Sequence, residues 1–479
     1  MEQFVNAVNG YVWSMPLIIL CLGAGLWFSI RTRFVQFRRV PHMVRLLLAG
    51  TSSEAGVSSF QALAMSLSGR VGIGNIAGVA TAIAFGGPGA VFWMWVMAFL
   101  GASTAFVEST LAQIYKETDD QGKYRGGPAY YIEKAMGQKW YAWLFAVVTI
   151  IAAGFLLPGV QANGIASAAQ NAWDVPPAAT AAFVVIGLGF IIFGGVKRIA
   201  RFAELVVPFM ALAYILMALV IMFLNMAQIP AMFMLIFESA FGMHAGFGAM
   251  LGLAVEWGVK RGIYSNEAGQ GTGPHHAAAA EVSHPAKQGY VQAFSVYVDT
   301  LLVCSATAFM ILSTGMYNVL GRGGESVMEA LPGIEPGPGY AQFAVESVMP
   351  GFGAGFVAMA LFFFAFTTIV AYYYMAETNI AYINRRIHRP WMIFALRIAI
   401  LAAVTFGAVR TAGMAWTLGD IGVGLMAWLN LIAILILQKP ALVALRDYEA
   451  QKAMGLDPTF DPLRLEIRNA DFWVGSREK

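Results

Sequence analysis

Apolar runs near twenty residues long, the length that crosses a bilayer as a helix, recur along the whole chain. They constrain the fold more than any other feature, because only helices and closed barrels satisfy their backbone hydrogen bonds in lipid. With 58% hydrophobic and 12% charged residues, the composition lies outside the range of soluble domains. The sequence therefore predicts an all-α polytopic membrane protein.

We expect about eleven spans. Their approximate limits are 12–30, 57–85, 89–115, 140–169, 176–196, 203–224, 240–258, 288–315, 352–380, 391–411 and 414–437. Lys and Arg gather in alternate connections, including the one with Lys260 and Arg261, whereas the other connections are nearly free of base. By the positive-inside rule, this pattern predicts an external N-terminus and a cytoplasmic C-terminus. The expected location is the plasma membrane, as a multi-pass protein of a bacterial inner membrane.

The second expected span is interrupted by S-G-R-V-G-I-G-N-I-A-G, residues 68–78. A glycine costs about 1 kcal/mol against alanine inside a helix, and a charge at bilayer depth costs more. A second glycine-rich stretch, F-G-M-H-A-G-F-G-A-M-L-G, covers residues 241–252. If the first span is accessory, five plus five helices remain, and the two stretches fall at equivalent places of an inverted repeat. The alternative is that these glycines only allow close helix packing.

Four parts follow from this division. Residues 1–56 form the external N-terminus, the accessory helix and a basic cytoplasmic loop. Residues 57–225 form the first five-helix repeat, and residues 226–438 form the second, with an external loop at 316–350. That loop either packs over the outer mouth or is a flexible connector. The cytoplasmic tail, 439–479, is expected to begin as a short amphipathic helix.

A broken membrane helix can bind ligands through its own backbone groups, without a cofactor. Its second half begins with free N–H groups that suit a carboxylate, and its first half ends with carbonyls that suit a cation. One break can thus hold an amino acid and an ion together. The spans carry no nucleophile–base pair, no H-E-x-x-H motif and no filter-like repeat, so we expect neither an enzyme nor a channel.

Several motifs in this chain are similar to one family. The stretch S-L-S-G-R-V-G-I-G-N-I-A-G-V-A-T-A-I resembles the signature of the alanine or glycine:cation symporters (sodium:alanine symporters), in the amino acid–polyamine–cation superfamily. The likeness continues in G-G-P-A-Y-Y-I (126–132), W-G-V-K-R-G-I-Y-S-N-E-A-G (257–269), D-T-L-L-V-C-S-A-T-A (299–308) and F-A-F-T-T-I (364–369). The resemblance implies the leucine-transporter fold and sodium-coupled symport of a small neutral amino acid into the cell. The implied partners are the amino acid, Na⁺ and the lipid bilayer, with no cofactor and no nucleic acid.

The resemblance also implies site residues. On the substrate side it implies the N–H groups of Ile73 and Gly74, with Gln161, Thr368, Tyr372 and Gly246. For Na⁺ it implies two positions, one with Asn75, the Arg70 carbonyl and Asp299, the other with the Ser68 and Val71 carbonyls, Thr367 and Thr368. Alternatives stay open: the threonines bond back to their own helix, Gln161 makes an interhelical bond, and Asp299 is structural or carries a proton instead.

Other charged and histidine side chains are expected outside the binding site. Glu256 and Glu377 are candidates for gate pairs with Lys260, Arg261 or Arg385. His275 and His276 are expected in a cytoplasmic loop.

Two residues depart from the family pattern. The family usually has threonine at the position of Ile73 and tryptophan at the position of Tyr372, and both positions would border the substrate side chain. The smaller tyrosine could admit a larger or more polar amino acid, so a shifted specificity is the alternative to alanine or glycine.

Overall fold

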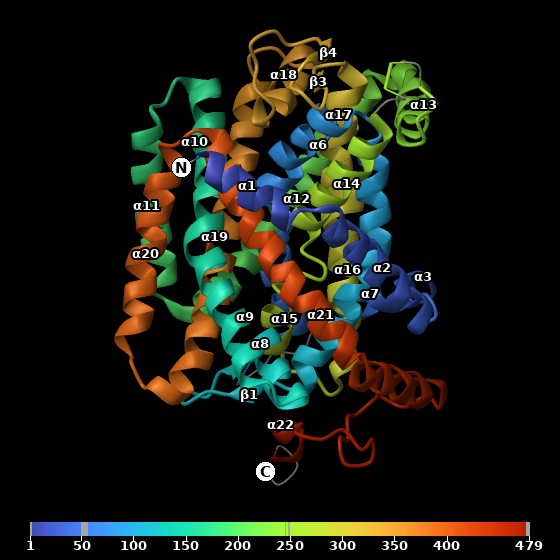
Figure 1. Ribbon diagram of the computed structural model, residues 1–479, viewed down its shortest axis with the longest axis vertical. Helices are drawn as coiled ribbons and strands as arrows, with labels where there is room; N and C mark the ends of the chain where they lie inside the picture. Colours follow the sequence, from blue (N-terminus) through green and yellow to red (C-terminus); the bar gives the residue numbers. More distant parts are fainter. Residues whose placement is uncertain (1, 49–55, 245, 248–249, 476–479) are drawn as a thin grey trace.

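The computed structural model describes residues 2–48, 56–244, 246–247 and 250–475 (Figure 1). The helices up to residue 173 are α1 (Glu2–Val12), α2 (Met15–Arg31), α3 (Val35–Arg38), α4 (Val40–Leu48), α5 (Ser59–Arg70), α6 (Val79–Gly86), α7 (Ala90–Ile114), α8 (Pro128–Tyr131), α9 (Lys139–Ile151) and α10 (Leu157–Trp173). The next are α11 (Pro177–Ile192), α12 (Gly195–Leu224), α13 (Ile229–Ala240), α14 (Leu251–Asn266), α15 (Gly273–Ala279), α16 (Pro285–Val296) and α17 (Ser305–Thr314).

The last helices are α18 (Pro338–Val348), α19 (Gly353–Ile387), α20 (Trp391–Ala408), α21 (Ala412–Ala453) and α22 (Asp471–Gly475). Wider π-helical turns occupy Gly74–Gly78, Ile132–Met136, Ala152–Leu156 and Tyr297–Cys304. Two short antiparallel ladders complete the chain, β1 (Glu117–Thr118) with β2 (Tyr124–Arg125), and β3 (Asn318–Leu320) with β4 (Ser326–Glu329). The chain is therefore an all-α polytopic membrane protein, as the sequence predicts.

Eight helical segments of the described chain are long and apolar enough to cross a bilayer, and a bent pair, α5 and α6, adds one more. Two shorter apolar helices lie at Pro177–Ile192 and Met226–Ala240. The expected span at 240–258 is wrong, because α13 ends at Ala240 and α14 begins only at Leu251. Which side faces the cytoplasm, and the division into two repeats, stay predictions.

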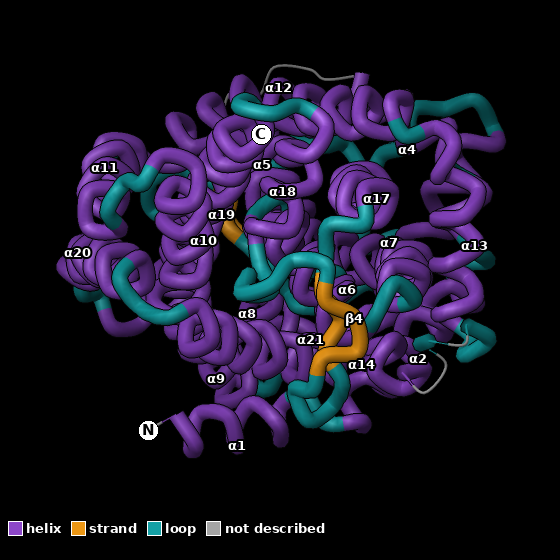
Figure 2. The backbone as a smooth tube through the Cα atoms, turned by 90° about the horizontal axis from the view of Figure 1, so that it is seen from above, coloured by secondary structure: helices purple, strands orange, loops and turns teal. Residues whose placement is uncertain are grey.

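The helices form one bundle with an apolar outside and an apolar core that encloses clusters of polar side chains. Seen from above, α11 and α20 lie at one edge and α13 at another, with α6, α10 and α19 between them (Figure 2). On α12, the side chains of Leu205 and Phe209 are 77% and 71% exposed. Asn75 and Asp299 are fully buried. Apolar groups face outward because the surrounding solvent is lipid, so the buried polar groups mark where a site lies.

The segment 316–350 is not a flexible connector. It forms the β3–β4 ladder and α18, which packs on α10, α17 and α19 at one end of the bundle (Figure 1). Asn318 ties the segment together, since its side chain bonds the backbone of Ala330 and Leu331.

The tail differs from the expectation. Instead of a separate helix after residue 439, α21 continues through Pro440 to Ala453. The chain then turns back toward the bundle, where the indole of Trp473 donates to the Gln113 carbonyl at 2.9 Å.

Candidate functional site

The first helix break lies between α5 and α6. A capping box of Ser58 and Gln61 starts α5, which ends at Arg70, and the chain resumes as a π-helical turn at Gly74. The two halves are bent by 53°. Glycines at 69, 72, 74 and 78 lower the helix propensity here. The break therefore opens the backbone at the centre of a buried helix.

Side chains already bind the N–H groups of this break. The Ile73 N–H donates to Gln161 Oε1 of α10 at 2.9 Å, and the Gly72 N–H donates to Asn75 Oδ1 at 2.8 Å. The Ile73 side chain packs on Gly164, where an added Cβ would lie 2.2 Å from Ile73 Cδ1. Gln161 thus satisfies a backbone N–H of the break with its side-chain amide oxygen.

Thr368 of α19 reaches the carbonyl side of the same break. Its hydroxyl lies 2.8 Å from the Ser68 carbonyl oxygen and 3.3 Å from that of Val71, and 2.9 Å from the Phe364 carbonyl of its own helix. Gly72 allows this approach, because a Cβ there would lie 2.5 Å from Thr368 Oγ1. Oxygen ligands of this kind suit hard cations.

Thr367 does not join that group. Its hydroxyl donates to the Phe364 carbonyl at 3.0 Å and faces the sulfur of Met210 on α12. Consecutive helical residues point about 100° apart, so only one of the pair can face the break. The structure brings Thr368 to Ser68 and Val71 and leaves Thr367 in contact with another helix.

A second polar cluster surrounds Asp299. Its carboxylate accepts bonds from Asn75 Nδ2 at 2.6 Å, from Ser265 Oγ at 2.9 Å and from Thr300 Oγ1 at 2.7 Å. Thr307 Oγ1 bonds the Asn75 carbonyl. The structure thus unites two predicted site residues, Asn75 and Asp299, and adds hydroxyls that the sequence did not single out.

The Arg70 side chain, as distinct from the backbone carbonyl proposed for Na⁺, points away from the Asp299 cluster. Its guanidinium donates to the Gln292 carbonyl at 3.2 Å and to the Ser295 hydroxyl, both on α16. Its Nε and Nη2 atoms have no hydrogen-bond partner among the described residues. Arg70 is buried in the protein, with a relative exposure of only 2%.

The helix break that faces the first one lies between α14 and α15, at residues 267–272. Gly269 and Gly271 both have φ of +85°, and Glu267 has φ of +57°. The Gly269 N–H donates to Glu108 Oε1 at 3.2 Å, and Asn430 Nδ2 donates to the Gly269 carbonyl at 2.9 Å. Glu108 and Asn430 therefore hold this break in place.

The two breaks pack directly on each other. A Cβ on Gly69 would lie 3.3 Å from Glu267 Oε2, and one on Gly74 would lie 3.2 Å from the ring of Tyr264. Glu267 Oε1 and both side-chain polar atoms of Gln270 lack hydrogen-bond partners within the described part of the chain. Buried polar groups are normally satisfied, so these atoms are available to a polar ligand.

The expected second break at 241–252 is therefore wrong. Gly246 lies in the connection between α13 and α14; it is exposed, and its N–H bonds His244 Nδ1 at 3.2 Å. The structure does not bring Gly246 to the other predicted residues. The second break could have been found in the stretch S-N-E-A-G-Q-G-T-G, residues 265–273, where polar residues alternate with the glycines.

Lys260 and Arg261, which were expected in a connection between spans, do not lie in a loop. Both lie buried on α14, where Lys260 Nζ is 2.8 Å and Arg261 Nη1 is 2.7 Å from the Asp420 carboxylate. The Arg261 guanidinium also covers the Trp416 ring at 4.5 Å. These bases can enter the bundle because one carboxylate and aromatic faces compensate their charge.

The expected loop position of His275 and His276 and the expected ion-pair partners of Glu377 are also wrong. His275 and His276 are buried on α15, and His275 Nε2 lies 2.8 Å from Asn379 Nδ2. Glu377 pairs with Arg125 at 3.3 Å rather than with Arg385.

The other two residues expected in gate pairs, Arg385 and Glu256, also form ion pairs with different residues. Arg385 binds Glu117 and Glu133, and Glu256 faces Arg322 at 3.9 Å.

Two interrupted helices that face each other inside one bundle define a membrane transporter of the leucine-transporter class. The structure is similar to MhsT, solved in complex with L-phenylalanine, with a TM-score of 0.54 over 81% of this chain and 95% of that one, at 16% identity. This likeness confirms the predicted fold.

The chain belongs to the sodium:alanine symporter family, whose profile matches residues 1–462. It is 63% identical to the putative sodium/proton-dependent alanine carrier protein YrbD of Bacillus subtilis, covering 99% of this chain and 98% of that protein. It is 57% identical to a sodium/proton-dependent alanine carrier protein of Bacillus sp. PS3, covering 90% and 97%. The chain is thus an integral membrane transporter and not an enzyme.

Proposed function

We propose that this protein carries a small neutral amino acid, of the alanine or glycine type, into the cell together with Na⁺. The observation that carries the proposal is the first break, where an amide N–H and two carbonyl oxygens meet polar side chains from two other helices. Such a break can hold a zwitterion and a cation at once. The names of the two relatives, both alanine carriers, support the substrate class.

In this proposal, the Ile73 and Gly74 N–H groups hold the substrate carboxylate. Gln161 exchanges its bond to Ile73 for bonds to the substrate. Tyr372, which interacts with Gln161 and is 2% exposed, bounds the space for the substrate side chain. The bulk of Ile73 and Tyr372 favours a short side chain, while a tyrosine in place of the larger tryptophan leaves a larger or polar substrate as the alternative.

The proposed cation positions follow the two oxygen clusters. The first consists of Asn75, the Arg70 carbonyl and Asp299, with Ser265 and Thr300 as additional oxygens. The second consists of the Ser68 and Val71 carbonyls with Thr368. The contacts support Thr368 in this role and favour Thr367 as a structural residue.

Coupling to H⁺ is the second candidate, with Asp299 as the group that carries the proton. The observation behind it is that Asp299 is a fully buried carboxylate beside the first break. The test is uptake into proteoliposomes with either a Na⁺ gradient or a pH gradient, and a panel of amino acids. We expect uptake that follows the Na⁺ gradient and persists when the pH gradient is collapsed; uptake that follows only the pH gradient contradicts the sodium proposal.

A further inference from the structure

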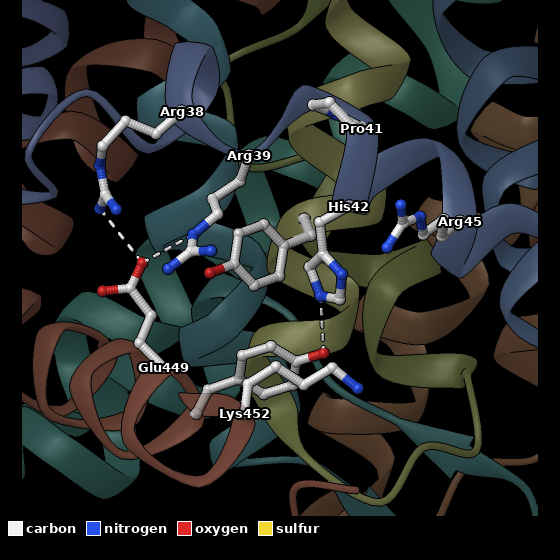
Figure 3. Close-up of a pocket in the computed structure, with 9 residues that line it drawn as sticks. Arg38, Arg39, Pro41, His42, Arg45, Glu449 and Lys452 are labelled. Atoms are coloured by element: carbon white, nitrogen blue, oxygen red, sulfur yellow. Dashed lines mark hydrogen bonds and ion pairs between the residues drawn. The ribbon is translucent and has the colours of Figure 1, made fainter. Parts of the chain in front are cut away.

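A basic cavity lies apart from the two breaks. It has a volume of about 270 Å³ and opens between α3, α4, α16 and α21 (Figure 3). Four bases line it, Arg38, Arg39, Arg45 and Lys452, against one carboxylate, Glu449. The lining thus carries three net positive charges when histidine is neutral, four bases minus one acid.

The walls of this basic cavity are built by specific contacts. The Glu449 carboxylate binds Arg38 and Arg39, each at 3.1 Å, and so holds both guanidinium groups beside the opening (Figure 3). His42 Nε2 lies 2.8 Å from the Tyr448 hydroxyl, and its ring packs edge-on against Tyr290 at 5.2 Å. The arginines are therefore oriented and not free surface side chains.

Two of the bases have no ion-pair partner within the described ranges of the chain. Among the residues that the structure describes, no carboxylate lies within ion-pair distance of Arg45 or Lys452. The pKa of His42 is lowered to about 4, by burial and then by Lys452, Arg39 and Arg45. The nearby bases therefore add to the effect of burial in disfavouring a positive charge on His42.

The cavity lies where membrane spans end. α2 ends at Arg31, seven residues before Arg38, and Tyr290 lies in the first part of the apolar helical segment Pro285–Thr314. α21 has 42 residues, about 63 Å of helix, so its last turns extend beyond a hydrocarbon core of about 30 Å. Next to the arginines, Phe34 and Phe37 are 44% and 52% exposed, as aromatic residues at a membrane interface are.

We propose that this cavity binds the phosphodiester headgroup of an acidic membrane lipid. Arginine binds phosphate oxygens through two parallel N–H donors, and lysine binds them as a point charge. Basic pockets beside membrane helices bind acidic headgroups on these grounds. Phe34 and Phe37 would contact the acyl chains, which a soluble phosphate compound lacks. The lipid would then join α4, which precedes the first broken helix, to the end of α21.

The test compares the binding of phosphatidylglycerol and phosphatidylcholine to the purified protein in detergent, by native mass spectrometry. In the wild type we expect phosphatidylglycerol to bind more tightly. The double variant Arg45→Gln/Lys452→Gln should bind it roughly 30-fold more weakly, from the loss of two bases near the surface. Phosphatidylcholine binding should not change.

The matched control is Lys439→Gln/Arg446→Gln, which removes the same charge from exposed positions on the same helix. An equal loss in both double variants, or no loss in either, would overturn the proposal. If the first double variant does not fold, Arg45→Gln alone should still weaken phosphatidylglycerol binding about fivefold.

A further arm uses inorganic phosphate at constant ionic strength. If phosphate binds more tightly than phosphatidylglycerol and displaces it, the ligand is a soluble phosphate compound and the lipid proposal is wrong.

Discussion

The Thr368 hydroxyl lies 2.8 Å from the Ser68 carbonyl oxygen, although 300 residues separate them in the chain. This contact joins α19 to the end of the first half of the broken helix. The carbonyls of a helix end have no intrahelical partners. The Thr368 hydroxyl and the carbonyls of Ser68 and Val71 therefore form one group of oxygens. Any ligand that enters the group must compete with these bonds.

Thr368→Ala should weaken the coupling to Na⁺. The variant removes one oxygen of the proposed second cation position, and a lost bond of this kind is worth about 1–1.5 kcal/mol, or roughly a tenfold loss of Na⁺ affinity. The measurement is amino acid uptake into proteoliposomes as a function of Na⁺ concentration.

Thr367→Ala is the control for that experiment. Its hydroxyl donates to the Phe364 carbonyl of its own helix and faces the Met210 sulfur instead of the break, so the Na⁺ dependence should stay close to that of the wild type. If the two variants behave alike, the assignment of Thr368 is wrong.

Asp299→Asn should abolish uptake driven by a Na⁺ gradient while the protein remains folded. The amide keeps the shape of the side chain and can still accept a bond from Ser265 or Thr300, but it removes the negative charge from the first proposed cation position. Uptake is measured separately with a Na⁺ gradient and with a pH gradient. Sodium-driven uptake that persists in this variant would refute the first cation position.

Tyr372→Trp, alone and with Ile73→Thr, should shift the substrate preference toward glycine and alanine. The larger indole takes volume from the substrate side chain, and a single methylene in such a pocket changes discrimination by about 10- to 200-fold. Competition against labelled alanine by a panel of amino acids measures the shift. If the wild type already binds alanine and glycine far more tightly than all larger or polar amino acids, the idea of a relaxed specificity fails.

Asp420→Asn should destabilise the fold strongly. It leaves Lys260 and Arg261 as buried charges without their carboxylate, and breaking a buried pair in this way costs about 3–5 kcal/mol. Glu256→Gln serves as the comparison, because its pair with Arg322 is long and exposed and should contribute no more than about 1 kcal/mol. Thermal unfolding in detergent measures both; equal shifts would contradict the prediction.

Glu133, outside the membrane spans, should make stability depend on pH. Burial alone would raise its pKa, but the bond from Tyr382 and the charges of Arg385 and Arg386 outweigh burial and lower it. A lowered pKa stabilises the fold above the ordinary value of 4.5, and that contribution is lost as the pH falls through the lowered value.

Glu133→Gln should therefore unfold more readily than the wild type at pH 7, by about 1 kcal/mol because the pairs are partly exposed. The difference should shrink near pH 3. A difference that does not change with pH would show that Glu133 acts only by packing.

Much of the proposed site was accessible from the sequence because its signals are local. Glycines and an arginine within an apolar run mark the first break whatever surrounds it, and the family motif names Asn75 and Thr368. The second break was misplaced for a related reason. Glycine content alone favoured residues 241–252, whereas the break between Glu267 and Thr272 is also stabilised by Glu108 and Asn430, which come from other helices.

The sequence by itself determined that the chain spans a membrane as helices, that one span is interrupted at residues 68–78, and which family it belongs to. These follow from the length of apolar runs and from motifs, which are properties of neighbouring residues. Only the tertiary structure decided which of two adjacent threonines faces the break, that Asp420 brings Lys260 and Arg261 into the bundle, and that Ser265 joins Asp299. Each of these depends on a partner from another helix, and a linear pattern does not specify which helices meet.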